Sequence, residues 1–334
     1  MTGRPRAACW TLAGLTLLVV GLFLASLLIG PALIAPSRAL AALATGEDPI
    51  AALVMRSIRL PRALLALLIG AGLGASGAAL QGYLRNPLAE PGLLGISGAA
   101  ALGATIALYS GVSAALPLAL PAAALAGAAL ATLLVQALAG AGGGSITLIL
   151  AGVAVSSLAG ALTSLVLNLS PNPFAASEIV YWLLGSLADR SMLHVYVAAP
   201  FLLVGLVLLL AVGRALDALT LGEDAAASLG VTLGRTRTLV VLGSAFAVGA
   251  GVAVAGAIGF VGLVVPHLLR PLTGALPSRL LPASALGGAV LLLAADIAVR
   301  LLAPERDLKL GVLTALVGAP FFLWLVWRGR RRLA

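Results

Sequence analysis

Long apolar runs separated by short polar segments extend along the whole chain. A bilayer core of about 30 Å requires about 20 apolar residues per helix, and the 334-residue sequence contains ten such runs, of which the eighth is short. The runs cover residues 9–31, 63–81, 92–109, 116–138, 146–169, 193–212, 238–259, 260–272, 283–302 and 311–327. This pattern predicts an all-α, polytopic membrane protein of about ten transmembrane helices, organised as a single transmembrane domain over residues 1–334.

The composition agrees with this class and excludes others. Hydrophobic residues make up 61% of the chain and charged residues 9%, whereas soluble domains have about 45–50% apolar and about 25% charged residues. A soluble globular protein and an intrinsically disordered chain are therefore both excluded.

Few residues offer chemistry of their own. The single Cys9 excludes a disulfide framework within the chain, and His194 and His267 lie too far apart to form a recognisable metal motif. The only lysine, Lys309, does not follow a glycine-rich turn, which excludes a Walker A ATPase. We therefore expect no catalytic residue and no metal site in this chain.

The basic residues predict an orientation in the membrane. An even number of helices places both termini on one side. With the termini in the cytoplasm, twelve basic residues are cytoplasmic and eight are outside, so the positive-inside rule favours this orientation modestly. Residues 32–62 then form an outer loop, and residues 213–237 form the longest cytoplasmic connection.

Small residues recur every four positions in several of the predicted helices, which favours close packing of helix backbones. The stripes are Gly70, Gly74, Ala78 and Gly82; Gly95, Ala99, Gly103 and Ala107; and Gly243, Ala247, Gly251, Ala255 and Gly259. The stripe of the fifth helix is more polar, with Gly152, Ser156, Gly160, Ser164 and Asn168. A polar stripe faces protein or water, so it either lines a translocation pathway or forms hydrogen bonds between helices.

An arginine cluster precedes the second predicted span. Arg56, Arg59 and Arg62 recur at three-residue spacing on one side of a helical turn, and Pro61 is suited to begin the next helix. On the outer side of the membrane, such a patch either accepts carboxylates from a partner or anchors phospholipid headgroups.

The cytoplasmic connection contains a predicted short helix. Thr220, followed three residues later by Glu223, reads as a capping box, and Gly230 is suited to end the helix. A short helix outside the membrane is a candidate docking element for a partner protein.

Asp296 and Arg300 are spaced to pair along one face of the ninth helix. An ionisable residue within a span is a functional candidate by default. Because Asp296 lies near the helix end, a structural ion pair is the favoured interpretation.

Several sequence blocks have a recognisable pattern; they comprise residues 59–62, 75–77, 81, 86–95, 219–223, 229–230, 256–267, 281–286, 314–315 and 318–320. Together these blocks resemble the FecCD family, the permease subunits of ABC importers for iron–siderophores, haem and vitamin B12. The blocks follow the family order and span most of the chain. One departure is Lys309, within the segment Asp307–Gly311, where the family usually has Glu-Leu-Pro before the glycine.

The resemblance implies a type II ABC importer permease in the bacterial inner membrane. The chain would form a homodimer, with two cytoplasmic ATPase subunits below and one periplasmic substrate-binding protein above. ATP and magnesium would be bound by the ATPase, and this chain would hold no cofactor. Transport would follow alternating access.

Residue roles carried over from the family form three groups. The arginines that dock the binding protein would be Arg56, Arg59 and Arg300. The residues that couple to the ATPase would be Leu221, Gly222, Glu223, Ala226, Leu229 and Gly230. The gate and translocation pathway would be formed by Asn86, Leu88, Ser145, Ile146, Gly152, Ser156, Gly160 and Ser164.

Alternatives remain for the substrate and for the class. An iron–siderophore leads, followed by vitamin B12 or another corrinoid, because residues 86–95 look like the B12 permease segment, and then by haem. A proton-coupled secondary transporter would need buried carboxylates or histidines as a relay, but Asp296 is the one acidic residue well inside a span. A membrane enzyme is disfavoured because no nucleophile, base and orienting group cluster together.

Overall fold

The structure is a computed structural model that describes residues 4–30, 32, 34–46, 48–140, 144–170, 173–303 and 308–330. Its helices are α1 (Arg4–Leu28), α2 (Pro36–Ala44), α3 (Pro49–Leu53), α4 (Leu60–Tyr83), α5 (Ile96–Tyr109), α6 (Val112–Ala115), α7 (Ala119–Ala139), α8 (Ser145–Asn168), α9 (Pro173–Leu183), α10 (Met192–Ala211), α11 (Gly213–Leu219), α12 (Glu223–Ser228), α13 (Leu233–Ala255), α14 (Val261–Leu269), α15 (Pro277–Leu302) and α16 (Leu310–Arg330). A π-helical turn, η1, covers Val54–Arg59, and a 3-10 turn, η2, covers Pro91–Leu94.

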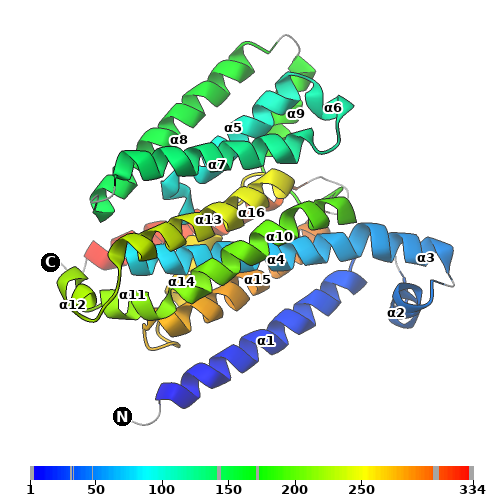
Figure 1. The fold of residues 1–334 in the computed structure, drawn as a ribbon. Coiled ribbons are helices and arrows are strands. Elements are labelled where there is room, and N and C mark those ends of the chain that lie inside the picture. The colour runs from blue at the N-terminus through cyan, green and yellow to red at the C-terminus, as the bar shows by residue number, and fades with distance from the viewer. Residues whose placement is uncertain are drawn as a thin grey trace.

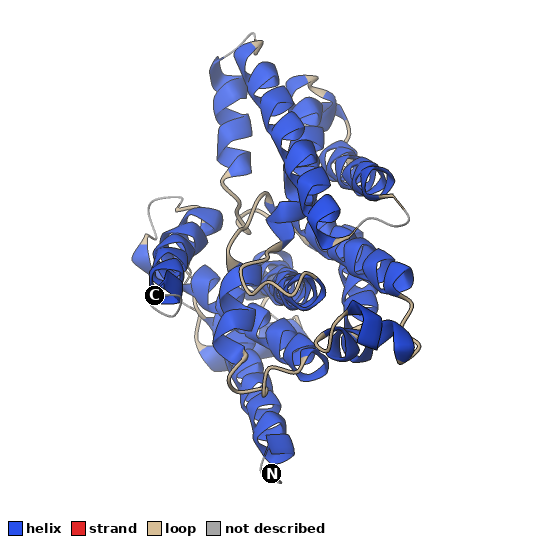
Figure 2. Cartoon of the chain, turned by 90° about the vertical axis from the view of Figure 1, so that its left-hand side faces the viewer, coloured by secondary structure: helices blue, strands red, loops and turns tan. Residues whose placement is uncertain are grey.

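The described residues contain helices and loops but no strand, which confirms the all-α prediction (Figure 2). Each of the ten predicted spans has one counterpart, in the order α1, α4, α5, α7, α8, α10, α13, α14, α15 and α16. Eight helical segments in the described part of the chain are long and apolar enough to cross a membrane, and α5 is a shorter apolar helix. The helix expected to be short is α14.

The helices form layers around α4. Helices α10, α13, α14 and α15 pack directly on α4, whereas α5, α7 and α8 form a separate group on one side and α1 packs on the other (Figure 1). In the most apolar part of the helical segment Pro49–Tyr83, which contains α4, 78% of the residues are buried, compared with 17% for α1. Helix α4 is therefore the centre of the subunit.

Backbone contact at small residues explains the tight packing of α4. A Cβ atom added to Gly74 would lie 1.9 Å from the carbonyl oxygen of Ser284 in α15, and one added to Gly77 would lie 1.8 Å from that of Gly262 in α14. Such distances exclude any side chain. Gly74 confirms the prediction that its stripe lets helices approach closely, whereas Gly77 lies outside that stripe and adds a contact that was not predicted.

The segment before α4 differs from the predicted outer loop. Residues 32–62 contain α2 and α3, and α3 continues through η1 into α4, so that helix extends from Pro49 to Tyr83. Pro61 lies in the first turn of α4, as predicted, but α4 does not follow a loop, because η1 leads into it without a break. The wider π turn of η1 ends two residues before Pro61, the second residue of α4, and such a turn accommodates a residue that lacks an N–H group.

The first residue of α1 and the last residue of α16 lie at the same end of the helix bundle as α11 and α12 (Figure 1). Helices α2, α3, α6 and α9 lie at the opposite end, together with the end of α1 that follows its long apolar run. This arrangement agrees with the expected even number of crossings, and the two ends are here called the termini end and the far end.

Candidate functional site: two helix ends joined by a central bundle

The short helix α12 at the termini end has the expected position but not the expected cap. Thr220 donates its hydroxyl to the carbonyl oxygen of Asp217 at 2.6 Å, within α11. The N-cap of α12 is Gly222, at a φ of 108°, so Glu223 is its first residue. The predicted capping box is therefore wrong, because the glycine turn places Glu223 two positions too early to reach back to the cap.

The other end of α12 is as predicted. Gly230 has a φ of 85° and follows the helix. The N–H group of Val231 donates to the carbonyl oxygen of Ala226 at 3.0 Å, which closes the last turn.

The side chains of α12 divide into an anchor and an exposed face. Ala226 is fully buried against the bundle, so it fixes α12 in place and does not face a partner. Leu221 and Leu229, on either side of the helix, are 68% and 65% exposed. Glu223 is also exposed. Two leucines projecting from a short helix outside the spans form a surface suited to docking.

Asp217 connects this segment to the bundle, a role that nothing in the sequence pattern indicates. Its carboxylate accepts a hydrogen bond from the backbone N–H of Ser278 at 2.8 Å. Ser278 is in the first turn of α15, whose own N-cap, Leu276, has no side-chain acceptor. Asp217 therefore caps α15 from 61 residues away.

The predicted gate loop lies beside α12. Asn86 accepts a hydrogen bond from the N–H of Leu88 at 2.9 Å, which forms a tight Asx turn. Arg85, at a φ of 48°, forms an ion pair with Glu223 in α12 at 3.4 Å. Burial raises the pKa of the Glu90 carboxyl, which follows this turn. The loop and α12 are thus in direct contact.

Gln81 holds the base of this loop. Its Nε2 atom donates to the carbonyl oxygens of Gly262 and Leu263 at 3.4 Å, and its Oε1 atom accepts from Arg270 at 2.7 Å. Gln81 is 1% exposed. A buried amide with partners on both sides fixes the end of α4 to α14.

The gate residues at the start of α8 are both placed in its first turn. Ser145 is the first residue of α8 and is partly buried, and Ile146 is 74% exposed. The preceding residues 141–143 lie outside the described part of the chain.

The polar stripe of α8 has two kinds of position. A Cβ atom on Gly152 would lie 2.0 Å from the carbonyl oxygen of Leu93 in η2, so Gly152 is a packing contact and not part of an open lining. Gly160 has no atom within 4 Å of its Cβ position, and Ser164 is exposed. Ser156, which lies between Gly152 and Gly160 along the helix, is partly buried. The open face of α8 therefore begins near Ser156.

At the far end, Asp296 is fully buried between two arginines. Its carboxylate accepts from Arg62 Nε at 2.8 Å and from Arg300 Nη2 at 2.9 Å. The expected pair of Asp296 and Arg300 is confirmed, and Arg62 joins it from α4. This geometry identifies a structural ion-pair network that joins α4 to α15.

Two arginines also satisfy the last carbonyl groups of α1. Arg59 donates to the carbonyl oxygens of Leu27 and Leu28 at 2.9 Å and is 3% exposed. Arg300 donates to that of Ile29 at 2.7 Å. Cations stabilise the negative end of a helix dipole, so both residues cap α1.

The three predicted docking arginines therefore differ from one another. Arg59 and Arg300 depart from the expectation that they face a partner, because α1 and Asp296 occupy their guanidinium groups. Arg56 is exposed, and its guanidinium donates to the carbonyl oxygen of Leu43 at 2.7 Å. Of the three, only Arg56 presents its side chain at the surface.

The residue that departs from the family pattern has a defined contact. Lys309 Nζ lies 5.7 Å from the centre of the Tyr181 ring in α9. The N–H of Gly311 also donates to the carbonyl oxygen of Gly185 at 3.1 Å. The start of α16 is therefore held by the segment that follows α9, while Asp307 lies outside the described residues.

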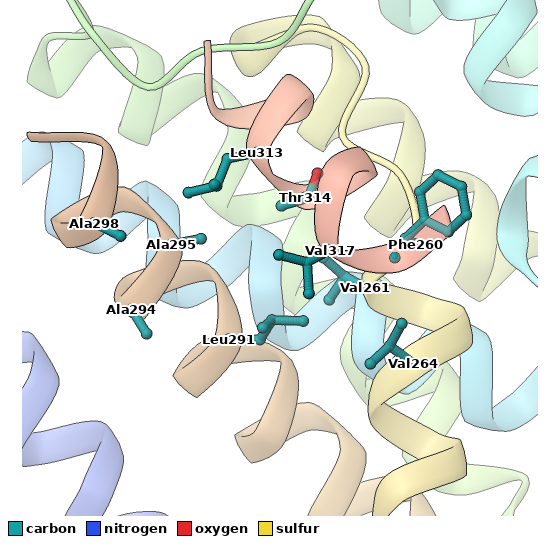
Figure 3. Close-up of a pocket in the computed structure, with 11 residues that line it drawn as sticks. Phe260, Val261, Val264, Leu291, Ala294, Ala295, Ala298, Leu313, Thr314 and Val317 are labelled. Carbon is teal, nitrogen blue, oxygen red and sulfur yellow. The ribbon is translucent and has the colours of Figure 1, made fainter. Parts of the chain in front are cut away.

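Helices α14, α15 and α16 enclose an apolar pocket of about 270 Å³ (Figure 3). Val264, Leu291 and Val317 project into it from the three helices. The hydroxyl of Thr314 donates to the carbonyl oxygen of Gly311 in its own helix, at 3.0 Å. This pocket offers no charged group and does not suit a polar ligand.

Comparisons with known proteins agree with this arrangement. The family model described as the FecCD transport family matches residues 17–328. The chain is 40% identical to the vitamin B12 import system permease protein BtuC of Salmonella typhi, over 98% of each chain. It is also 40% identical to the Fe(3+) dicitrate transport system permease protein FecD of Escherichia coli strain K12, over 83% of this chain and 86% of the relative.

A solved structure gives the same fold. It is described as an inward-facing conformation of a metal-chelate type ABC transporter, with a TM-score of 0.85 and 36% sequence identity. The alignment covers 95% of this chain and 98% of that one. The chain thus belongs to the FecCD transport family and is a multi-pass inner-membrane permease of an ABC importer.

Proposed function

We propose that this chain forms the membrane pathway through which a metal chelate, an iron–siderophore in the first place, is imported at the expense of ATP. The observation that carries the proposal is the exposed pair Leu221 and Leu229, which flank α12, together with the contact between Glu223 of α12 and the gate loop. This pair offers an ATPase subunit a surface from which movement reaches the gate. ATP and magnesium bind to that partner, and this chain carries no cofactor and no enzymatic activity.

The proposed assembly contains two copies of this chain, two cytoplasmic ATPase subunits and one periplasmic binding protein. The termini end, with α12, faces the cytoplasm, and the far end, with Arg56, faces the periplasm. The two copies meet so that the open faces of their α8 helices, from Ser156 to Ser164, line the central route. Alternating access then follows when the ATPases move α12 and the gate loop together.

Vitamin B12 or another corrinoid and haem are the alternative cargoes. The relatives above are named for iron(III) dicitrate and for vitamin B12, which supports a chelate without selecting one. Uptake of a labelled iron–siderophore, cobalamin and haem is measured in parallel, in proteoliposomes that contain the permease, its ATPase and its binding protein. We expect ATP-dependent uptake of the iron–siderophore. If only cobalamin or only haem were taken up, that compound would be the substrate instead of the iron–siderophore. If none of the three were taken up, the proposal of a chelate importer would be contradicted.

Removing the two exposed leucines of the α12 segment should weaken assembly with the ATPase. Burial of a leucine contributes about 1.5–3 kcal/mol, so the double variant Leu221→Ala, Leu229→Ala should bind the ATPase at least about tenfold more weakly. Leu272→Ala serves as the control, because Leu272 is also an exposed leucine, at 53%. Binding is measured by pull-down and titration of the purified ATPase. Equal binding by the double variant and the control would remove α12 as the docking element.

Reversing the charge of Arg56 should remove most of the stimulation by the binding protein. We propose that Arg56 accepts a carboxylate of that protein, while Arg59 and Arg300 hold α1 and Asp296 in place behind it. Arg56→Glu should leave basal ATP hydrolysis unchanged and remove most of the increase caused by the binding protein, whereas Arg56→Lys should retain most of it. If the binding protein still stimulated ATP hydrolysis fully in the Arg56→Glu complex, this assignment would be contradicted.

A further inference from the structure

A second pocket, of about 430 Å³, lies at the far end between the α5–α7 group and the segment from α9 to α10. Its walls are partly apolar, with Leu108, Leu120 and Pro121. Unlike the pocket in Figure 3, it also contains charged and polar side chains, which are Glu178, Arg190 and His194. None of these residues belongs to the gate, the coupling element or the arginine network described above.

Among the described residues, the guanidinium of Arg190 has no hydrogen-bond acceptor. Within the described residues, its guanidinium forms no hydrogen bond and no ion pair, and its Nε atom is buried without a partner. Burial lowers its pKa, which the neighbouring Asp189 opposes. A partly buried guanidinium with only a neighbouring Asp189 charge and no hydrogen-bond acceptor is costly, so this position favours an anion in the pocket.

His194 supplies a second donor. Its Nδ1 atom accepts a hydrogen bond from the backbone N–H of Ser191 at 3.1 Å. In the neutral imidazole, the proton is therefore on Nε2. No described residue accepts a hydrogen bond from that atom, so Nε2–H is available to a ligand beside Arg190.

Glu178 gives the pocket its opposite charge. It lies on α9 at the exposed side of the pocket. A simple anion that binds Arg190 and His194 would make no use of this carboxylate. A ligand that carries both an anionic and a cationic group satisfies all three side chains.

The position of the pocket at the ends of three helices indicates an amphipathic ligand. Leu108 is the second-to-last residue of α5, Leu120 is the second residue of α7, and His194 is in the first turn of α10. The ends of three apolar helices mark the boundary between the hydrocarbon core and the headgroup region. Trp182, which also lines the pocket, is a residue typical of that boundary.

We propose that this pocket binds the headgroup of a zwitterionic aminophospholipid. The phosphate accepts hydrogen bonds from Arg190 and His194, the primary ammonium donates to Glu178, and the acyl chains leave past Leu108 and Leu120. A choline headgroup has no N–H group for Glu178, and a glycerol headgroup has no cation. The site therefore selects phosphatidylethanolamine over phosphatidylcholine and phosphatidylglycerol, independently of the import function.

The test is lipid retention by the purified full-length chain. The protein is exchanged into detergent with equal amounts of the three phospholipids, and bound lipid is counted by native mass spectrometry. We expect retained phosphatidylethanolamine, at least tenfold less of it with Arg190→Gln, and an unchanged amount with Arg214→Gln, a control at the termini end. Glu178→Gln should retain phosphatidylethanolamine and phosphatidylcholine equally.

Two further arms separate the other occupants. Soluble phosphoethanolamine added in excess should displace little of the lipid, because it lacks acyl chains; complete displacement would identify a soluble phosphoester site. Equal phosphatidylethanolamine retention by Arg190→Gln and the wild type would overturn the proposal. The proposal would also be overturned if Arg190→Gln retained the lipid but no longer associated with the binding protein, because the pocket would then be a protein-docking site. Should Arg190→Gln fail to fold, the headgroup selectivity of Glu178→Gln decides alone, because that exposed change leaves the fold intact.

Discussion

Replacing Asp296 with alanine should lower the free energy of unfolding by about 3–5 kcal/mol, the range for removing one partner of a buried ion pair. Asp296 is fully buried, and it is the acceptor for Arg62 and Arg300 at 2.8 Å and 2.9 Å. Without the carboxylate, two guanidinium groups face each other with no counter-charge. The change is measured by denaturant unfolding of the purified permease in detergent.

Two further variants serve as controls for the Asp296→Ala result. Asp224→Ala, at an exposed aspartate of α12, should change the free energy of unfolding by no more than about 0.5 kcal/mol. Adding Arg62→Met to Asp296→Ala should recover part of the loss, because it removes one of the uncompensated charges. A loss as small as that of Asp224→Ala would contradict the ion-pair network.

Replacing Gly77 with alanine should destabilise the protein by about 3 kcal/mol or more, at the upper end of the cost of overpacking. The added Cβ atom would lie 1.8 Å from the carbonyl oxygen of Gly262 and 2.5 Å from its Cα atom. Because the obstacle is backbone, α14 itself must move, and the hydrogen bond from Gln81 to the same carbonyl group would be disturbed.

The matched control for Gly77 is Gly160→Ala. Gly160 also lies in a spanning helix, but nothing lies within 4 Å of its Cβ position. Alanine has the higher helix propensity by about 1 kcal/mol, so the same measurement should show no loss and up to that gain. Opposite signs at the two glycines are the expected result, and equal losses would show that close packing is not the reason for Gly77.

The spans could be predicted from the sequence because each depends on local apolar content. All ten predicted runs correspond to helices, and Gly70 and Gly74 of the predicted stripe lie at close backbone contacts, whereas the contact at Gly77 lies outside that stripe. The pairing of Asp296 with Arg300 was accessible for the same reason, since four-residue spacing on one helix fixes their proximity.

Features that depend on distant partners could not be predicted in this way. Arg59 looks like a surface residue in the sequence, but its acceptors lie in α1, about one span away along the chain. Asp217 caps α15 from another helix, and Gly152 belongs to a polar stripe but packs on η2. Pro61 lies in the first turn of α4 as predicted, but the π turn that joins α4 to α3 has no signal in the sequence.

The contact between the gate loop and α12 gives the proposed mechanism its physical path. Arg85 and Glu223 join the two elements on the surface, and Gln81 fixes the loop to α14 below it. A displacement of α12 by a bound ATPase therefore reaches both the loop and the central bundle. Neither connection requires a titrating group inside a span, which distinguishes this mechanism from a proton-coupled one.

The measurement that tests the central claim most directly is the energy dependence of uptake. Proteoliposomes that contain the permease, its ATPase and its binding protein are given labelled substrate with either ATP on the ATPase side or a proton gradient across the membrane. The account predicts accumulation with ATP, none with a non-hydrolysable analogue, and none with the proton gradient alone. Accumulation that follows the proton gradient and ignores ATP would contradict it.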